Sequence, residues 1–155
     1  MTAILAVYTV HVVYLNCVVE DAYITYRFAK HLASGLGLVW NPHEAPVEGY
    51  TNFLWLLVSA GAIKVGLDAP RFTQVAGTLC GGATILLTYA AGRLAGWPRA
   101  LAIVPALMLA VSGPFATWSG SGMETVPFTS FVLVAVFAFG KYWQKEQPKW
   151  LVILR

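Results

Sequence analysis

Charge is the scarcest property of this 155-residue chain. Ten basic and seven acidic residues make up 11% of it, whereas a soluble domain carries about 25% charged residues. So few charges cannot cover the surface of a soluble globule, and a hydrophobic content of 58% excludes disorder. The net charge of +3 is small and scattered, so the chain is not expected to bind nucleic acid. The composition instead predicts an integral membrane protein.

Two long stretches contain no charged residue at all, residues 2–19 and residues 72–92. A helix that crosses a bilayer needs about 20 apolar residues, so each stretch predicts one transmembrane span. The only two cysteines, Cys17 and Cys80, lie within these stretches. Their separation fits neither a disulfide framework nor a metal site, so we interpret them as packing residues.

A third stretch, residues 100–140, contains a single charge, Glu124. It is too long for one span, and glycine, serine and proline interrupt it near residues 112–114 and 119–122. We therefore predict two spans, 100–116 and 126–140, joined by a short polar turn.

The remaining apolar segments are incomplete. Residues 51–66 are short for a span and include Lys64, so we expect this segment to be short or re-entrant. Another span begins near residue 150, which leads us to expect the N-terminal portion of a longer protein. The predicted fold class is all-α: one membrane domain, residues 1–155, built as a multi-spanning helical bundle.

Charge reappears in the segment after the first predicted span, where residues 20–48 hold six of the charged side chains. Asp21 is a candidate N-cap, and Ile24, Phe28 and Leu32 recur with helical spacing. These features predict an amphipathic helix over 21–34 that lies in the membrane interface, within an outer loop 20–49.

Lysine and arginine gather near residues 93–99 and 141–149, which the positive-inside rule assigns to the cytoplasm. If residues 51–66 do not cross fully, the outer loop and Glu124 share the extracytoplasmic face. We therefore expect Glu124 to approach the acidic pair Glu20-Asp21.

Each acidic group has two interpretations. Glu20 and Asp21 are either a solvated helix start, with Asp21 as the N-cap, or a general base. The second interpretation is favoured because desolvating two adjacent carboxylates at a membrane surface is costly and has little structural benefit. Glu124 is either a solvated turn residue or a functional acid at membrane depth.

Three strings resemble a known family. They are Glu20-Asp-Ala-Tyr-Ile-Thr-Tyr-Arg-Phe-Ala29, Gly35-Leu-Gly-Leu-Val-Trp-Asn-Pro42 and Val47-Glu-Gly-Tyr-Thr-Asn-Phe-Leu-Trp55. Together they resemble the first extracytoplasmic loop of GT-C-fold glycosyltransferases, nearest to the terminal arabinofuranosyltransferases of the mycobacterial cell wall. Ser121-Gly-Met-Glu-Thr125 resembles the Ser-Gly-Leu-Glu-Thr element of the same branch.

The resemblance implies a polyprenyl-phosphate-dependent sugar transferase of the bacterial cytoplasmic membrane, whose acceptor is a glycan, lipid or protein of the cell envelope. It implies a catalytic base at Asp21 or Glu20, and the order Glu-Asp, where the family has Asp-Asp or Asp-Glu, leaves the choice between them open. Besides this base, the expected substrate-binding residues are Arg27, Lys30, Glu48, Tyr50, Thr51 and Glu124. A divalent cation is an open question, since no ligand spacing predicts a metal site. The alternative is a non-catalytic membrane subunit or transporter fragment whose loop acids bind an ion or partner.

Overall fold

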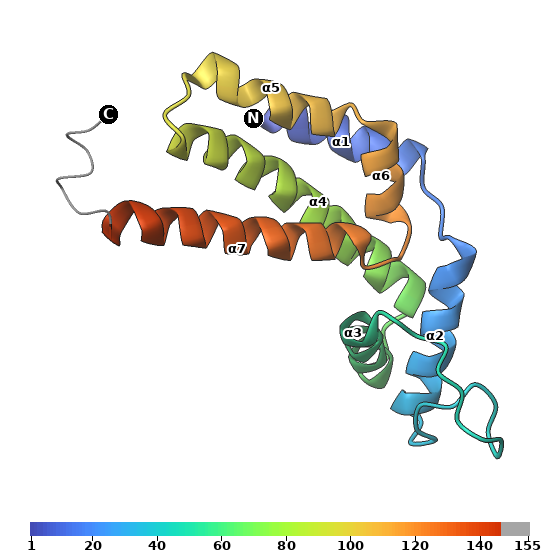
Figure 1. Ribbon diagram of the computed structural model, residues 1–155. Helices are drawn as coiled ribbons and strands as arrows, with labels where there is room; N and C mark the ends of the chain where they lie inside the picture. Colours follow the sequence, from blue (N-terminus) through green and yellow to red (C-terminus); the bar gives the residue numbers. More distant parts are fainter. Residues whose placement is uncertain (147–155) are drawn as a thin grey trace.

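The computed structural model describes residues 1–146, which form seven helices and no strand (Figure 1). The helices are α1 Thr2–Tyr14, α2 Glu20–Ala33, α3 Phe53–Lys64, α4 Ala69–Leu94, α5 Arg99–Ala110, α6 Gly113–Gly120 and α7 Thr125–Glu146. The all-α class is therefore confirmed for the described part of the chain. The span predicted to start near residue 150 lies outside the described residues.

Two helices, α4 and α7, are long and apolar enough to cross a membrane. Helices α5 and α6 make a third candidate if they count as one span, although they meet at an angle of 60°. The apolar helices α1 and α3 have only 13 and 12 residues and fall below spanning length. The lengths and composition of these helices indicate a membrane protein.

Two predicted spans differ from the helices that form. Helix α1 ends at Tyr14 rather than at residue 19, because the backbone and side chains that follow bond elsewhere. The Asn16 carboxamide oxygen accepts a hydrogen bond from Gln74 of α4, and the Val19 amide donates to the Ser121 carbonyl. The predicted span 100–116 is broken at Ser112, whose hydroxyl caps α6, with Pro114 in the first turn of that helix.

Small residues along one side of α4 bring the other helices close to it. Thr73, Gly77, Gly81 and Thr84 recur every three or four positions and are all buried. A Cβ at Gly77 would collide with the backbone of Ser119 in α6, and a Cβ at Gly81 would collide with the Tyr8 hydroxyl of α1. Small residues at such spacing let helix backbones approach closely within a membrane.

A pair of buried hydroxyl groups joins α4 to α7. The hydroxyl oxygens of Thr84 and Ser130 lie 2.6 Å apart, and the Ser130 hydroxyl donates to the Cys80 carbonyl at 2.7 Å. The two helices run side by side along most of α7 (Figure 1). Hydrogen bonds of this kind hold helices together where apolar burial against lipid gives no driving force.

Helices α2 and α3 pack against each other at the N-terminal end of α4 (Figure 1). The surface helix predicted over 21–34 is present with nearly those bounds, but its N-cap is Val19 rather than Asp21. Of the predicted stripe, Phe28 is fully buried and Leu32 packs beside it, whereas Ile24 is exposed. The buried residues are Ala22, Thr25, Tyr26, Phe28 and Ala29, because α3 covers that side of α2.

Candidate functional site

A buried turn, residues 121–124, joins α6 to α7 and contacts both α2 and α3. Gly122 has a φ of +83°, and a Cβ there would collide with the Tyr26 hydroxyl. Its carbonyl oxygen accepts a hydrogen bond from the Trp55 indole at 2.9 Å. Glycine therefore serves here to let the turn approach α2 closely.

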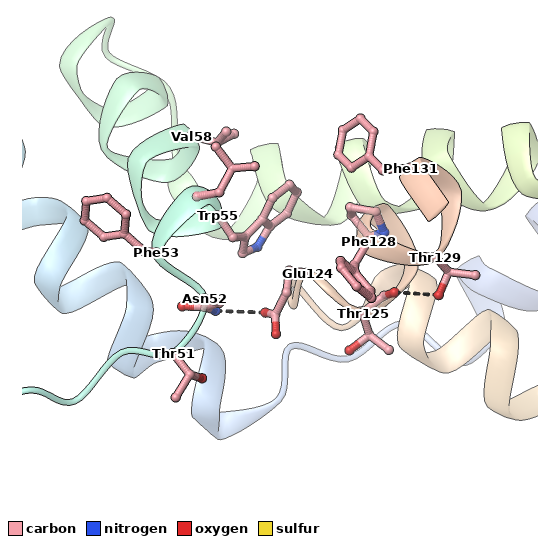
Figure 2. Close-up of a pocket in the computed structure, with 12 residues that line it drawn as sticks. Thr51, Asn52, Phe53, Trp55, Val58, Glu124, Thr125, Phe128, Thr129 and Phe131 are labelled. Atoms are coloured by element: carbon pink, nitrogen blue, oxygen red, sulfur yellow. Dashed lines mark hydrogen bonds between the residues drawn. The ribbon is translucent and has the colours of Figure 1, made fainter. Parts of the chain in front are cut away.

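Glu124 is held in place by a short chain of hydrogen bonds. The Asn52 side-chain amide donates to Glu124 Oε2 at 2.8 Å (Figure 2). The same amide donates to Thr25 Oγ1 at 3.0 Å. Thr25 belongs to α2, Asn52 immediately precedes α3 and Glu124 immediately precedes α7. Three segments distant in sequence thus converge on one polar corner.

Tyr26 reinforces this corner from within α2. Its hydroxyl oxygen lies 2.6 Å from Thr73 Oγ1 and 3.4 Å from the Gly122 carbonyl oxygen. Burial raises the pKa of Tyr26 above the ordinary value of 10.0, with a smaller opposing effect of the hydrogen bond to Thr73. The phenol therefore stays protonated and available as a donor at physiological pH.

A cavity of about 880 Å³ opens beside Glu124, between α3 and α7; we call it the α3–α7 cavity. Thr51, Asn52, Glu124 and Thr125 lie on one side of it, whereas Val58 and Phe131 lie on the opposite side (Figure 2). Its remaining lining residues are Phe53, Leu54, Trp55, Pro127, Phe128 and Thr129. The cavity therefore has a polar end and an apolar wall, as small-molecule sites commonly do.

A second cavity of about 420 Å³ lies between α1 and α4; we call it the α1–α4 cavity. Its polar edge is formed by Asn16, Arg71, Gln74 and Thr78, and its apolar lining by Val12, Val13, Val75 and Leu79. Arg71 is exposed, and its guanidinium is the one charged group in this lining.

The acidic pair occupies the first turn of α2, and both carboxylates are exposed. Neither side chain caps the helix, so the N-cap interpretation of Asp21 does not hold. Asp21 precedes Thr25 by about one helical turn and shares its side of α2, whereas Glu20 projects from another side. Because the Val19 amide bonds to Ser121, the turn that leads to Glu124 adjoins this first helical turn.

The two cations among the expected substrate-binding residues, Arg27 and Lys30, lie farther along α2. The Arg27 guanidinium donates to the Trp40 carbonyl and to Asn41 Oδ1, and its carbon lies 4.1 Å from the centre of a Trp40 ring. Lys30 is exposed, and nine residues of helix place it on the side of α2 opposite to Asp21. The structure thus ties Arg27 to the loop and turns Lys30 away from the polar corner.

The other predicted residues fall into different surroundings. Thr51 lines the α3–α7 cavity. Tyr50 packs edge-on against Phe28, with ring centres 4.9 Å apart, and is not part of the cavity lining. Glu48 is exposed in the loop and also lies outside the cavity lining.

Sequence reasoning missed the residues that organise the corner, Thr25, Asn52 and Trp55. A weak signal existed for Asn52, because asparagine before an apolar segment is a typical N-cap. Asn52 does occupy the N-cap position of α3, but its side chain makes no capping bond and turns to Glu124 instead.

No group of three or more histidine, cysteine or acidic side chains within residues 1–146 is placed to hold a metal ion. Near the α3–α7 cavity, the exposed carboxylates of Glu20 and Asp21 and the half-buried carboxylate of Glu124 are groups that can accept a proton or a hydrogen bond from a hydroxyl.

The chain matches no protein-family model, no curated protein and no solved structure.

Proposed function

We propose that the protein transfers a sugar from a polyprenyl-phosphate donor to an acceptor hydroxyl at the extracytoplasmic face of the bacterial cytoplasmic membrane. One observation carries the proposal: an exposed acidic pair, free of any capping role, adjoins the corner where Glu124 is held beside the α3–α7 cavity.

In this reaction a carboxylate of the pair takes the proton of the acceptor hydroxyl. The hydroxyl oxygen then bonds to the anomeric carbon of the sugar, and the bond from that carbon to the phosphate oxygen breaks. The polyprenyl phosphate leaves with the electron pair, and the configuration at the anomeric carbon inverts. A positioned base typically contributes about 10²–10⁴-fold to such a step.

The geometry supports Asp21 over Glu20 as the base. Asp21 lies on the Thr25 side of α2, and Thr25 is linked through Asn52 to Glu124 and the cavity. Arg27, two turns after Glu20, contributes positive charge near the leaving phosphate while the loop fixes its guanidinium.

The placement of charge along the bundle supports the proposed sidedness. Helices α2 and α3 lie at one end, whereas α4 ends and α5 begins at the other, where Arg93 and Arg99 are located (Figure 1). Lys64 and Arg71 lie at the α2–α3 end, but acidic residues offset them there, whereas no acidic residue lies between Arg93 and Arg99. Positive charge favours the cytoplasmic side, so the proposal puts the acidic pair outside. Transporters, by contrast, place their ionisable groups near the membrane midplane.

The test uses the protein as its gene encodes it, in nanodiscs, with radiolabelled polyprenyl-phosphate arabinofuranose and polyprenyl-phosphate mannose as donors and octyl glycosides as acceptors. Asp21→Asn is expected to lower transfer from the donor that is used by about 10²–10⁴-fold, and Glu20→Gln to lower it much less. Lys64→Gln, which alters an exposed residue at the last position of α3, serves as the control and should retain the wild-type rate. Wild-type transfer by the Asp21→Asn/Glu20→Gln double variant would refute the proposed base, and absence of transfer from both donors in the wild type would count against the proposed activity.

A further inference from the structure

The α3–α7 cavity has the dimensions of a ligand site. Its volume of about 880 Å³ falls within the range of roughly 300–1,000 Å³ that is typical for small-molecule pockets. Leu54, Phe128 and Phe131 keep 69%, 65% and 63% of their surfaces exposed, so the apolar wall is open to a hydrocarbon chain.

The negative charge of Glu124 determines which kind of amphiphile the cavity can bind. Among the described residues, 1–146, Glu124 is the only ionisable one in the lining, and no lysine, arginine or histidine of that range contributes to it. A phosphate head group would therefore meet a carboxylate with no compensating cation, which is unfavourable next to an apolar wall.

The helix ends at the polar side do not change this conclusion. Helices α3 and α7 both begin there, and helix N-termini favour negative charge. The Glu124 carboxylate already supplies that charge. In addition, Pro127, the third residue of α7, has no amide hydrogen to offer an anion.

Hydrogen-bonding capacity at the polar end matches hydroxyl groups. Asn52 donates to one carboxylate oxygen of Glu124, and a carboxylate accepts about four hydrogen bonds in all. Within residues 1–146, no further donor to the Glu124 carboxylate is described, since the Phe128 amide bonds to the Glu124 backbone carbonyl, and the hydroxyls of Thr51 and Thr125 have no described partner. Adjacent hydroxyls of a sugar ring are the neutral donors that use this arrangement best.

We infer that the α3–α7 cavity binds an uncharged glycolipid, with its sugar hydroxyls on Glu124 and its chain along α3 and α7. The inference rests on the proposed function in one respect: it assigns this glycolipid as the acceptor rather than the anionic donor. The sugar head then lies next to the side of α2 that carries Thr25 and Asp21.

Binding is measured separately from transfer, in phosphatidylcholine nanodiscs, with a diazirine-bearing dodecyl β-maltoside as the probe. Mass spectrometry then locates the crosslinks. On the wild-type protein the crosslinks should fall on α3 and α7. Unlabelled dodecyl maltoside should compete at least about tenfold better than dodecyl phosphate, a ratio that corresponds to one order of magnitude in affinity.

Two bulky substitutions of exposed apolar residues make a matched pair. Val58→Trp fills the apolar part of the α3–α7 cavity and should reduce labelling about tenfold, whereas Leu79→Trp, in the α1–α4 cavity, should leave it unchanged. Equal thermal midpoints of the two variants show that folding is not the cause. Glu124→Gln should narrow the preference for maltoside over dodecyl phosphate.

Equal or better competition by dodecyl phosphate would overturn the inference, as would labelling that Val58→Trp does not reduce. These outcomes are independent of the base assignment. Cavity labelling together with full transfer by the double variant would support the glycolipid site and reject the base. Transfer that depends on Asp21 but occurs without cavity labelling would support the base and reject the glycolipid site.

Discussion

The α3–α7 cavity and the α1–α4 cavity each combine an apolar lining with one charged side chain, but they hold that charge differently. The carboxylate of Glu124 is fixed by Asn52, which is itself bonded to Thr25. The guanidinium of Arg71 is exposed on α4. A charge fixed by tertiary contacts selects a ligand by geometry, whereas a mobile surface charge attracts counter-charges without much specificity.

The sharpest way to break this comparison is Gly122→Ala. The new Cβ would meet the Tyr26 hydroxyl in a backbone conformation with φ +83°. Left-handed strain and overpacking together should cost about 2–5 kcal/mol of unfolding free energy. The measurement is SDS titration in mixed micelles, followed by tryptophan fluorescence.

Gly96→Ala is the matched control, because Gly96 has the same φ and no atom within 4 Å of its Cβ position. It should cost only the backbone term of about 1–2 kcal/mol. Equal losses for the two variants would show that the turn does not press against α2 as described.

Replacing one side-chain amide at each cavity compares the stability that each hydrogen-bond network contributes. Asn52→Leu leaves the Glu124 carboxylate without its donor, a bond to a charged group worth about 1.5–3 kcal/mol, and it also removes the bond to Thr25, worth about 0.5–1.5 kcal/mol. Gln74→Leu removes hydrogen bonds to the neutral oxygens of Asn16 and Gly120, worth about 0.5–1.5 kcal/mol each. The same titration should therefore show the larger loss for Asn52→Leu, and the opposite order would contradict the view that Glu124 is the fixed charge.

The smallest effect is expected for Arg71→Gln. The Arg71 side chain is exposed, and the hydrogen bond to Asp68 comes from its backbone amide, which the substitution keeps. Its unfolding free energy should stay within about 0.5 kcal/mol of wild type. Glu124→Gln should lower the unfolding free energy by more, because it removes the charge from the hydrogen bond with Asn52. A larger loss of unfolding free energy for Arg71→Gln would contradict the view that Glu124 is the fixed charge.

The same contrast explains what the sequence could predict. Arg71, Gln74 and Thr78 lie at helical spacing on one helix, so a periodic pattern places them together. Glu124 and Asn52 are 72 residues apart, and they come into contact only because α3 and α7 both pack on α4. The long helices α4 and α7 lie in stretches that the missing charges marked, because a span requires apolar length. Residues 2–19 met the same criterion, yet α1 ends at Tyr14, because Asn16 and Val19 bond to other segments.

The buried face of α2 shows the limit of periodicity. Ile24, Phe28 and Leu32 form a correct helical stripe, yet Ile24 is 38% exposed and the small residue Ala22 is fully buried. Packing on α3 and the approach of Gly122 select small and hydroxyl-bearing residues on that side. Such a choice depends on the partner surface, which a single helix does not encode.

The hydroxyl pair between Thr84 and Ser130 has a consequence well away from its own position. It fixes the register of α7 along α4. Sliding α7 by one helical turn would move its first residue by about 5.4 Å, and Glu124 directly precedes that residue. A bond of 2.8 Å to Asn52 does not survive such a shift. The hydroxyls of Thr84 and Ser130 thus determine, through the register of α7, the position of the Glu124 carboxylate at the N-terminal end of the helix.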